Sequence, residues 1–302
     1  MYLNRLIKIL GNLNLAYDYY TILNELFRKN GHLPFMVTNY GQGKSLMRAR
    51  PMYPNEPRFK NVSDFSFKPQ KLNHTYQRAS TPYQSMFYAT TTRESPSDGE
   101  FDSARLISVE ESMPWVRDEN SVGVRKIAFA RWLAKESLNL ITIVHNSEYH
   151  KVNSYTKEVY EDFNKTISAS PKDYQDAVMN FHKALAYEFS KEVNNHLEYQ
   201  ISAIFSEIMC GRSDIDGILY PSFRMEGNGL NVAIKPQSMY KLGLYVAGES
   251  IIYKNKKELV LGNTAIVQLE EGTEAFEMID IENHEEECLN KIGVSSIEEL
   301  LL

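Results

Sequence analysis

The chain has 302 residues, a net charge of −6 and an ordinary balance of apolar, aromatic and charged residues. These values are typical of a globular protein with enough chain for one large domain or two modest ones. A net negative charge does not favour direct binding to nucleic acid or to an anionic membrane surface, so an anionic ligand would need a local cluster of basic side chains.

The cysteine count and the apolar runs indicate in which cellular compartment the protein is expected. Cys210 and Cys288 have no spacing that suggests a disulfide framework or a zinc site, which favours a reducing, cytoplasmic environment. No apolar run approaches the roughly 18–20 residues that span a bilayer, and polar residues interrupt the apolar N-terminal stretch. We therefore expect neither a membrane span nor a signal peptide.

The first 37 residues predict a helical arm. Apolar residues recur at helical intervals over residues 2–30, and Gly11-Asn12 divides them into two short helices. Tyr40-Gly-Gln-Gly-Lys-Ser45 follows and contains the Gly-Lys-Ser end of a phosphate loop. That motif needs a glycine where this chain has Thr38, so we do not interpret the segment as a phosphate loop.

Two arginines follow in a segment with an extended pattern. Arg48 and Arg50 lie two positions apart, and alternate side chains of a strand point to the same face. Such a pair can hold a pyrophosphate through charge-assisted hydrogen bonds, and the alternative is a solvated strand edge. Further along, Arg78 precedes a strand-like run that contains Tyr88, and residues 104–112 include the acidic pair Glu110 and Glu111.

The middle of the chain, residues 124–210, contains several further predicted elements. Residues 124–135 predict a helix or a mixed segment, and residues 138–144 predict a buried strand. His145 and His150 lie near Glu148, but their spacing does not match a zinc-binding helix, and we expect no metal site. Apolar residues at helical intervals predict two helices over residues 173–210, divided near Asn194 and ended by Gly211.

Two short apolar runs, Ile218 to Tyr220 and Leu230 to Ile234, predict buried strands. Between them lies a loop rich in glycine and polar residues, including Ser222 and Arg224, so the pair predicts a hairpin that can present polar groups to a ligand, and the alternative is an ordinary surface turn. After Pro236, residues 241–247, 250–253, 257–261 and 264–269 predict four short antiparallel strands. A capping box from Ser295 predicts a terminal helix.

The hairpin segment resembles a known family. Tyr220-Pro-Ser222, followed by a glycine and Asn231-Val, is similar to the C-terminal signature of the RES domain, a family that contains NAD-degrading toxins of bacterial toxin–antitoxin pairs. The resemblance covers roughly residues 46–111 and 197–237, in order. It departs from the family at Gln77, where a glycine is usual, and in the long stretch before the acidic pair.

The resemblance implies an α+β fold like that of ADP-ribosyltransferases, with a split, twisted sheet, flanking helices, the helical N-terminal arm and a helical insertion. It implies a helical arm at 1–37, a catalytic domain at 38–255 with an insertion at about 112–175, and C-terminal strands and a helix at 256–302. Glu111 is then the active acid, and Glu110, one position away, stays an alternative.

The same resemblance assigns the other site residues. Arg48 and Arg78 would hold the phosphates with Arg50 as a weaker candidate, and Tyr88 would form a wall of the nicotinamide pocket, although it can equally be a core residue. Ser222 and Asn231 would bond to the ribose or the nicotinamide. The expected function is cleavage of the nicotinamide–ribose bond of NAD+ by water or phosphate, with no cofactor beyond that substrate.

The expected partners are NAD+ and a protein antitoxin, with the oligomeric state left open. Two alternatives also remain open. The chain can be a mono-ADP-ribosyltransferase, or a non-catalytic nucleotide-binding or interaction module on the same fold.

Overall fold

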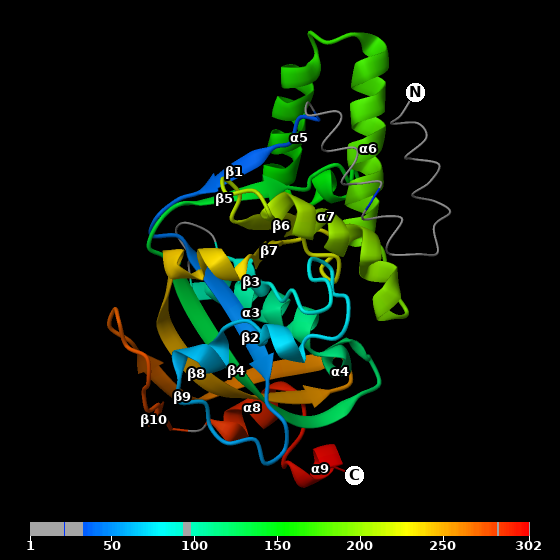
Figure 1. The fold of residues 1–302 in the computed structure, drawn as a ribbon. Helices are drawn as coiled ribbons and strands as arrows, with labels where there is room; N and C mark the ends of the chain where they lie inside the picture. The colour runs from blue at the N-terminus through cyan, green and yellow to red at the C-terminus, as the bar shows by residue number, and fades with distance from the viewer. Residues whose placement is uncertain (1–20, 22–32, 93–97, 283, 302) are drawn as a thin grey trace. The chain divides into compact units, whose positions relative to one another are not determined.

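The computed structural model describes residue 21 and residues 33–92, 98–282 and 284–301 (Figure 1). The described residues contain ten strands and several helices, so the mixed α+β class is confirmed. The finer likeness to ADP-ribosyltransferases stays a prediction, as does the predicted domain division. The helical arm predicted for residues 2–30 lies outside the described residues apart from residue 21.

The chain divides into two compact units. Unit 1 comprises residues 1–41, 67–88 and 137–239, and unit 2 comprises residues 42–66, 89–136 and 240–302. Each unit is therefore built from segments that are far apart in the sequence. The strand β3 (Phe87–Thr91) crosses from one unit to the other.

Unit 1 contains a mixed sheet in the order β1 (Val37–Tyr40), β5 (Leu138–Thr142), β6 (Gly217–Pro221) and β7 (Leu230–Ile234). Strands β5 and β6 are parallel, and the other pairs are antiparallel. The helices are α5 (Ser154–Ile167), α6 (Lys172–Ser190) and α7 (Gln200–Cys210), with 3₁₀ turns η2 (Gln70–Leu72), η3 (Tyr149–Lys151) and η4 (His196–Tyr199).

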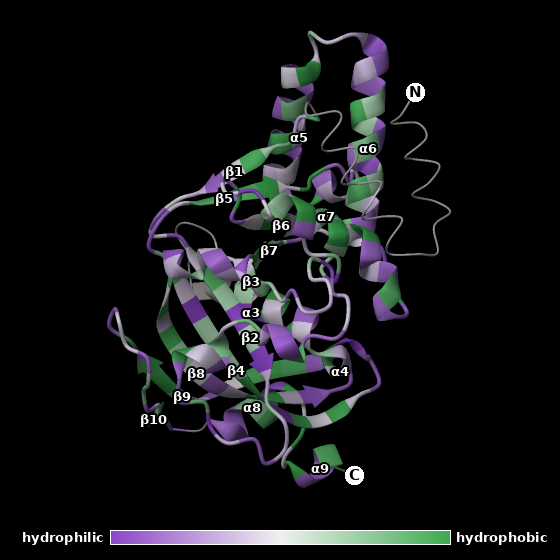
Figure 2. Cartoon of the chain, viewed as in Figure 1, coloured by the Kyte–Doolittle hydropathy of each residue, from purple (hydrophilic) through white to green (hydrophobic). Residues whose placement is uncertain are grey.

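The core of unit 1 lies between its sheet and the helices α6 and α7. Phe181, Leu185 and Phe189 of α6 pack with Phe205 of α7 against Ile218 of β6. The helices carry hydrophobic residues among hydrophilic ones, as Figure 2 shows. Helical spacing of the apolar residues produced this face, so the prediction of two helices over residues 173–210 is confirmed. The predicted strands of the hairpin are confirmed as β6 and β7.

Unit 2 contains an antiparallel sheet in the order β2 (Ser45–Pro51), β4 (Val122–Ala134), β8 (Leu242–Asn255), β9 (Glu258–Gln268) and β10 (Ile279–Asp280). Its helices are α3 (Asp98–Ser112), α4 (Pro114–Arg117), α8 (Glu285–Lys291) and α9 (Glu298–Leu301), with the 3₁₀ turn η1 (Val62–Phe65). The 3₁₀ segment η5 (Pro236–Lys241) leads from unit 1 into β8. The predicted terminal helix is confirmed as α9.

Two secondary-structure predictions in unit 2 are wrong. Residues 124–135 form most of strand β4 rather than a helix or mixed segment, because β4 pairs along its length with β8 and over half of it with β2. Ile127, Ala128, Phe129 and Ala130 are all buried, so the strand lacks the alternation that marks a half-exposed one. The four short strands predicted after residue 240 are instead the two long strands β8 and β9.

The break in the predicted pattern is a β-bulge. The pairing of β8 with β9 shifts between Glu249 and Ser250, next to Gly248. A Cβ at Gly248 would lie 2.9 Å from the carbonyl oxygen of Ala265, so glycine allows the two backbones to approach. Gly248 therefore serves the close pairing of β8 with β9.

Strand β2 begins at Ser45, directly after the Gly-Lys pair. A phosphate loop requires a helix at that point, so the structure agrees that this segment is not one. None of the described helices is both long and apolar enough to cross a lipid bilayer.

Candidate functional site

The predicted site residues fall in both units, and each group is described within its own unit. Unit 1 holds Arg78, Tyr88, Ser222 and Asn231. Unit 2 holds Arg48, Arg50, Glu110 and Glu111.

In unit 1 the two polar residues of the hairpin are buried at its base. Asn231 of β7 pairs with Tyr220 of β6, and Ser222 follows β6 directly. The backbone N–H of Ser222 donates to the carbonyl of Gly229 at 3.1 Å, and its own carbonyl accepts from the N–H of Gly227 at 2.7 Å. The side chains of Ser222 and Asn231 are 0% and 5% exposed, so the hairpin holds polar groups inside the unit.

The hairpin loop is fixed by a residue from another segment. Gly227 has a φ of +88°, and a Cβ there would lie 2.3 Å from Cγ of Tyr149. The side-chain amide of Asn153 also donates to the carbonyl of Gly227 at 3.0 Å. Only glycine fits this position, because it needs both the left-handed backbone and the space under the tyrosine ring.

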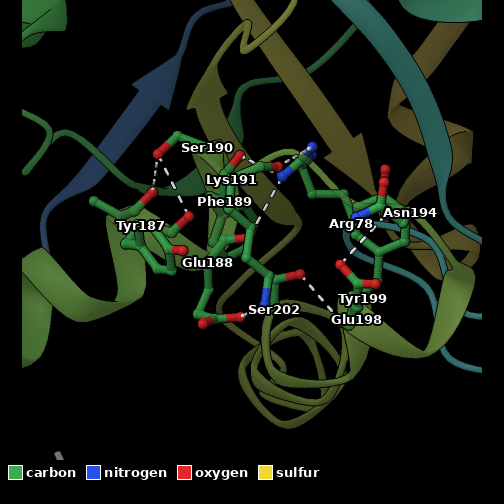
Figure 3. A network of polar contacts seen from close by, with 11 residues as sticks. Arg78, Tyr187, Glu188, Phe189, Ser190, Lys191, Asn194, Glu198, Tyr199 and Ser202 are labelled. Atoms are coloured by element: carbon green, nitrogen blue, oxygen red, sulfur yellow. Dashed lines mark hydrogen bonds and ion pairs between the residues drawn. The ribbon is translucent and has the colours of Figure 1, made fainter. Parts of the chain in front are cut away.

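Arg78 lies where the C-terminal end of α6 meets the hairpin loop. Its Nη1 donates to the carbonyl of Phe189 at 2.7 Å, and its Nη2 donates to the carbonyl of Lys191 at 3.3 Å (Figure 3). The guanidinium also lies 5.0 Å from the ring centroid of Tyr199 and 5.8 Å from that of Phe223. A cation is favourable at the negative end of a helix dipole.

These contacts bring Arg78 to the hairpin, because Phe223 follows Ser222 in the chain. They also commit part of the guanidinium to backbone carbonyls. The predicted role of Arg78 in holding a phosphate stays a prediction.

Tyr88 is held by its hydroxyl group. The hydroxyl accepts from the backbone N–H of Ala79 at 3.0 Å and lies 2.8 Å from Oγ of Ser80. Burial raises the pKa of Tyr88 well above its ordinary value, and the two hydrogen bonds oppose this only in part. The tyrosine hydroxyl is therefore neutral, and its two contacts hold the side chain against the loop that begins at Arg78.

In unit 2 the two arginines of β2 lie on one face of the sheet, as predicted. Their partners on β4 are small: Arg48 pairs with Ala130, and Arg50 pairs with Ala128. Arg50 is engaged, since its Nη1 donates to the carbonyl of Asp64 at 2.7 Å and its Nη2 pairs with the Glu56 carboxylate at 2.8 Å. Arg48 is half-buried and pairs with the small Ala130.

The acidic pair lies on α3, which the structure confirms as a helix. Ala104 and Val109 of α3 pack on Met47 of β2, and Oγ of Ser108 donates to the Met47 carbonyl at 3.2 Å. Side chains alternate along a strand, so α3 covers the face opposite to that of Arg48.

Glu110 is half-buried and Glu111 is exposed. Within unit 2 the structure therefore does not bring the acidic pair and the arginine pair together on one face.

Two buried carboxylates were missed by the sequence reasoning. Arg50 of β2 pairs with Ala128 of β4, and Ala128 pairs in turn with Glu249 of β8. Glu249 therefore lies on the same face of the sheet as the arginines. Its Oε2 accepts from Nε of Arg58 at 3.0 Å, and its Oε1 has no hydrogen-bond partner among the described residues.

The second is Glu188 in unit 1, where burial raises the pKa although Lys191, 2.7 Å away, opposes the rise. Glu249 can be assigned to the face of the arginines only from the pairing register of β8, which the sequence alone does not give.

A small cavity lies on the α3 side of the sheet in unit 2. It measures about 90 Å³ and is lined by residues that include Arg105, Phe129, Arg131 and Asn263. Arg105 donates from Nη2 to Oδ1 of Asn263 at 2.7 Å and lies 4.4 Å from the Phe129 ring centroid. A water molecule needs about 10–15 Å³ of such space, so this pocket has room for several waters.

The histidines considered for a metal have other surroundings. A ring nitrogen of His150 lies 2.7 Å from the carbonyl of Val144, and His145 is buried among aromatic rings. Within the described ranges no group of three or more histidine, cysteine or acidic side chains is arranged to hold a metal ion.

No protein-family model matches the chain, and a comparison with curated proteins also finds no match. The resemblance to the RES domain therefore remains a hypothesis that rests on the residues named above.

Proposed function

We propose that this chain cleaves the nicotinamide–ribose bond of NAD+ and acts as the toxin of a toxin–antitoxin pair. One observation in unit 1 carries the proposal. Arg78 and Tyr88 lie in one segment and the Ser222 loop lies more than 130 residues later, yet the Arg78–Phe223 contact and the Ala79–Tyr88 hydrogen bond gather them in one unit. A family resemblance spread over distant motifs requires such a convergence.

The chemistry needs three kinds of group. Cleavage of the bond passes through a cationic state at the ribose carbon, as in glycoside hydrolysis. A carboxylate stabilises that cation, fixed cations hold the phosphates, and an aromatic wall orients the leaving ring. Nicotinamide leaves as a neutral molecule, so the bond can break without a metal ion.

The residues would divide these roles. Arg48 would hold a phosphate, and Tyr88 offers a ring that its hydroxyl contacts hold in place. Ser222 and Asn231 would bond to the ribose or to the nicotinamide amide. Water, phosphate or a macromolecular group could then accept the ADP-ribose.

The test is release of nicotinamide from NAD+ by the purified chain, in water and in phosphate buffer. Arg48→Ala should abolish release. Arg212→Ala is the matched control, because the Arg212 side chain is exposed and pairs with nearby Asp214. A parent chain that releases no nicotinamide with water, phosphate or protein acceptors would overturn the proposal.

The acid is tested separately, because the resemblance and the sheet geometry point to different residues. Glu111→Gln and Glu110→Gln remove the acids that the resemblance implies. Glu249→Gln removes the buried carboxylate on the face of Arg48. The acid is the residue whose glutamine variant loses about 100-fold or more of the rate while it keeps the parent's unfolding free energy.

A second candidate is a non-catalytic nucleotide-binding module. The observation that favours it is the position of Glu110 and Glu111 on the helix α3, which covers the face opposite to Arg48. Such a module would bind ADP-ribose and release no nicotinamide. A mono-ADP-ribosyltransferase would instead modify a protein or nucleic acid, and mass spectrometry of treated targets detects the added group.

A further inference from the structure

One turn in unit 1 contains a residue that its backbone does not favour. Residues 81–84, Thr-Pro-Tyr-Gln, form a β-turn in which the N–H of Gln84 donates to the carbonyl of Thr81 at 3.0 Å. Pro82 is at the second position, and Tyr83 at the third has a φ of +64°. This is the pattern of a type II turn, whose third position favours glycine or asparagine.

The chain contains a matched turn that follows the rule. In residues 53–56, Tyr-Pro-Asn-Glu, the N–H of Glu56 donates to the carbonyl of Tyr53 at 3.0 Å. Asn55 occupies the third position with a φ of +68°. Asparagine tolerates this conformation, whereas an aromatic residue is strained by it. Tyr83 therefore departs from the turn chemistry of residues 53–56.

Burial of the ring does not explain the departure. Tyr83 is 59% exposed, so most of its ring lies in solvent. The backbone beneath it is rigid, since the N–H of Tyr83 donates to the carbonyl of Asn73 at 2.7 Å and the Asn73 amide donates to the carbonyl of Thr81 at 2.8 Å. Asn73 itself is fully buried. The turn thus fixes the backbone position of an exposed aromatic residue.

The ring also has a defined neighbourhood. The His74 ring contacts it edge to face, with centroids 5.2 Å apart and planes at 80°. The loop that carries Tyr83 also contains Arg78, and it ends at Tyr88, whose hydroxyl fastens the loop through Ala79. Strained backbone that the surrounding structure enforces is concentrated at ligand sites.

We propose that Tyr83 is a stacking platform for the adenine ring of a dinucleotide. The inference rests on the proposed function, in which Tyr88 contacts the nicotinamide end of the same ligand. A fixed tyrosine ring stacks on any nucleobase without base-specific hydrogen bonds. The ring at position 83 then compensates in binding for the backbone strain that it causes in the free protein.

The test is calorimetric binding of two half-ligands, AMP and nicotinamide mononucleotide. Tyr83→Asn removes the ring and suits the turn, and it should weaken AMP binding by about tenfold or more. Tyr83→Phe keeps the ring and should bind AMP like the parent. Nicotinamide mononucleotide should bind equally to all three chains, because it has no adenine.

Stability separates this role from a structural one. Tyr83→Asn should keep the melting temperature within about 2 °C of the parent, because strain relief offsets the lost ring contacts. Asn55→Tyr, the reverse change in the matched turn, should lower the melting temperature and leave AMP binding unchanged.

The inference is overturned if Tyr83→Asn binds AMP as tightly as the parent, or if it loses both half-ligands equally. If the chain cleaves NAD+ but binds AMP equally well with and without the Tyr83 ring, the proposed function holds and the role of Tyr83 is refuted. If AMP binding depends on Tyr83 but no nicotinamide is released, the role of Tyr83 holds and the proposed function is refuted.

Discussion

The buried histidine pair of unit 1 makes the protein sensitive to acid in a way that one substitution should reduce. His145 and His182 are stacked with ring centroids 4.5 Å apart, and they are 4% and 3% exposed. Phe163 and Tyr160 contact His145 edge to face, and neither ring nitrogen of His145 has a hydrogen-bond partner among the described residues. His145→Phe keeps an aromatic ring in this place and removes the group that can be protonated.

The magnitude follows from the pKa values. Burial, and secondarily the neighbouring His182, lowers the pKa of His145 to about 2. Burial lowers the pKa of His182 to about 4, although its hydrogen bond to the Pro34 carbonyl opposes this. An unfolded histidine has a pKa of about 6.5, so below that pH the unfolded chain binds protons that the folded chain does not.

The folded protein therefore loses stability as pH falls from 6.5 towards the folded pKa values. Between pH 7 and pH 5 each imidazole should cost about 2 kcal/mol, and the pair about 4 kcal/mol, out of a typical total of roughly 5–15 kcal/mol. The other titratable groups that affect His145 are His150 and Lys183, which also disfavour its protonation.

Urea unfolding at pH 7, 6 and 5 measures the effect. The difference in unfolding free energy between His145→Phe and the parent should change by about 2 kcal/mol in favour of the variant between pH 7 and pH 5. Any cost of the larger ring is independent of pH and shifts the whole curve. His284→Phe, at an exposed histidine, is the control variant. Parallel curves for His145→Phe would refute the reasoning.

Two further predictions concern the loops of the candidate site. Gly227→Ala puts a methyl group 2.3 Å from the Tyr149 ring at a φ of +88°, so the unfolding free energy should fall by about 3 kcal/mol or more. Gly43→Ala, at +84° with nothing within 4 Å of the new Cβ, is its control and should lose only about 1 kcal/mol. Arg78→Lys keeps the charge but loses the planar fork that reaches two carbonyls, and the melting temperature should fall by several degrees, whereas Arg212→Lys should leave it unchanged.

The parts of the fold that the sequence predicted correctly carry their signal in neighbouring residues. The helices α6 and α7 show a helical apolar pattern with Gly211 at the end, and β6 and β7 are short apolar runs with turn residues between them. These signals are local, so they survive without knowledge of the fold.

The strands of unit 2 were predicted less well because their cause is not local. Residues of β4 such as Ala128, Ala130 and Arg131 have no strong preference for strands, and pairing on both sides decides their conformation. The bulge at Glu249 has the same origin, since glycine beside polar residues marks both turns and bulges. The face on which Glu249 lies could be assigned only once the register of β8 was known.

The arginines of the candidate site differ in what their replacement can reveal. Arg50 and Arg78 both donate to backbone carbonyls, so replacing either one disturbs the fold whether or not it contacts a ligand. A loss of activity in those variants is therefore compatible with a purely structural role. Arg48 pairs with Ala130, and its replacement is informative when the unfolding free energy is measured beside the activity. Loss of nicotinamide release in Arg48→Ala, at unchanged unfolding free energy, would locate the chemistry on that face of the sheet.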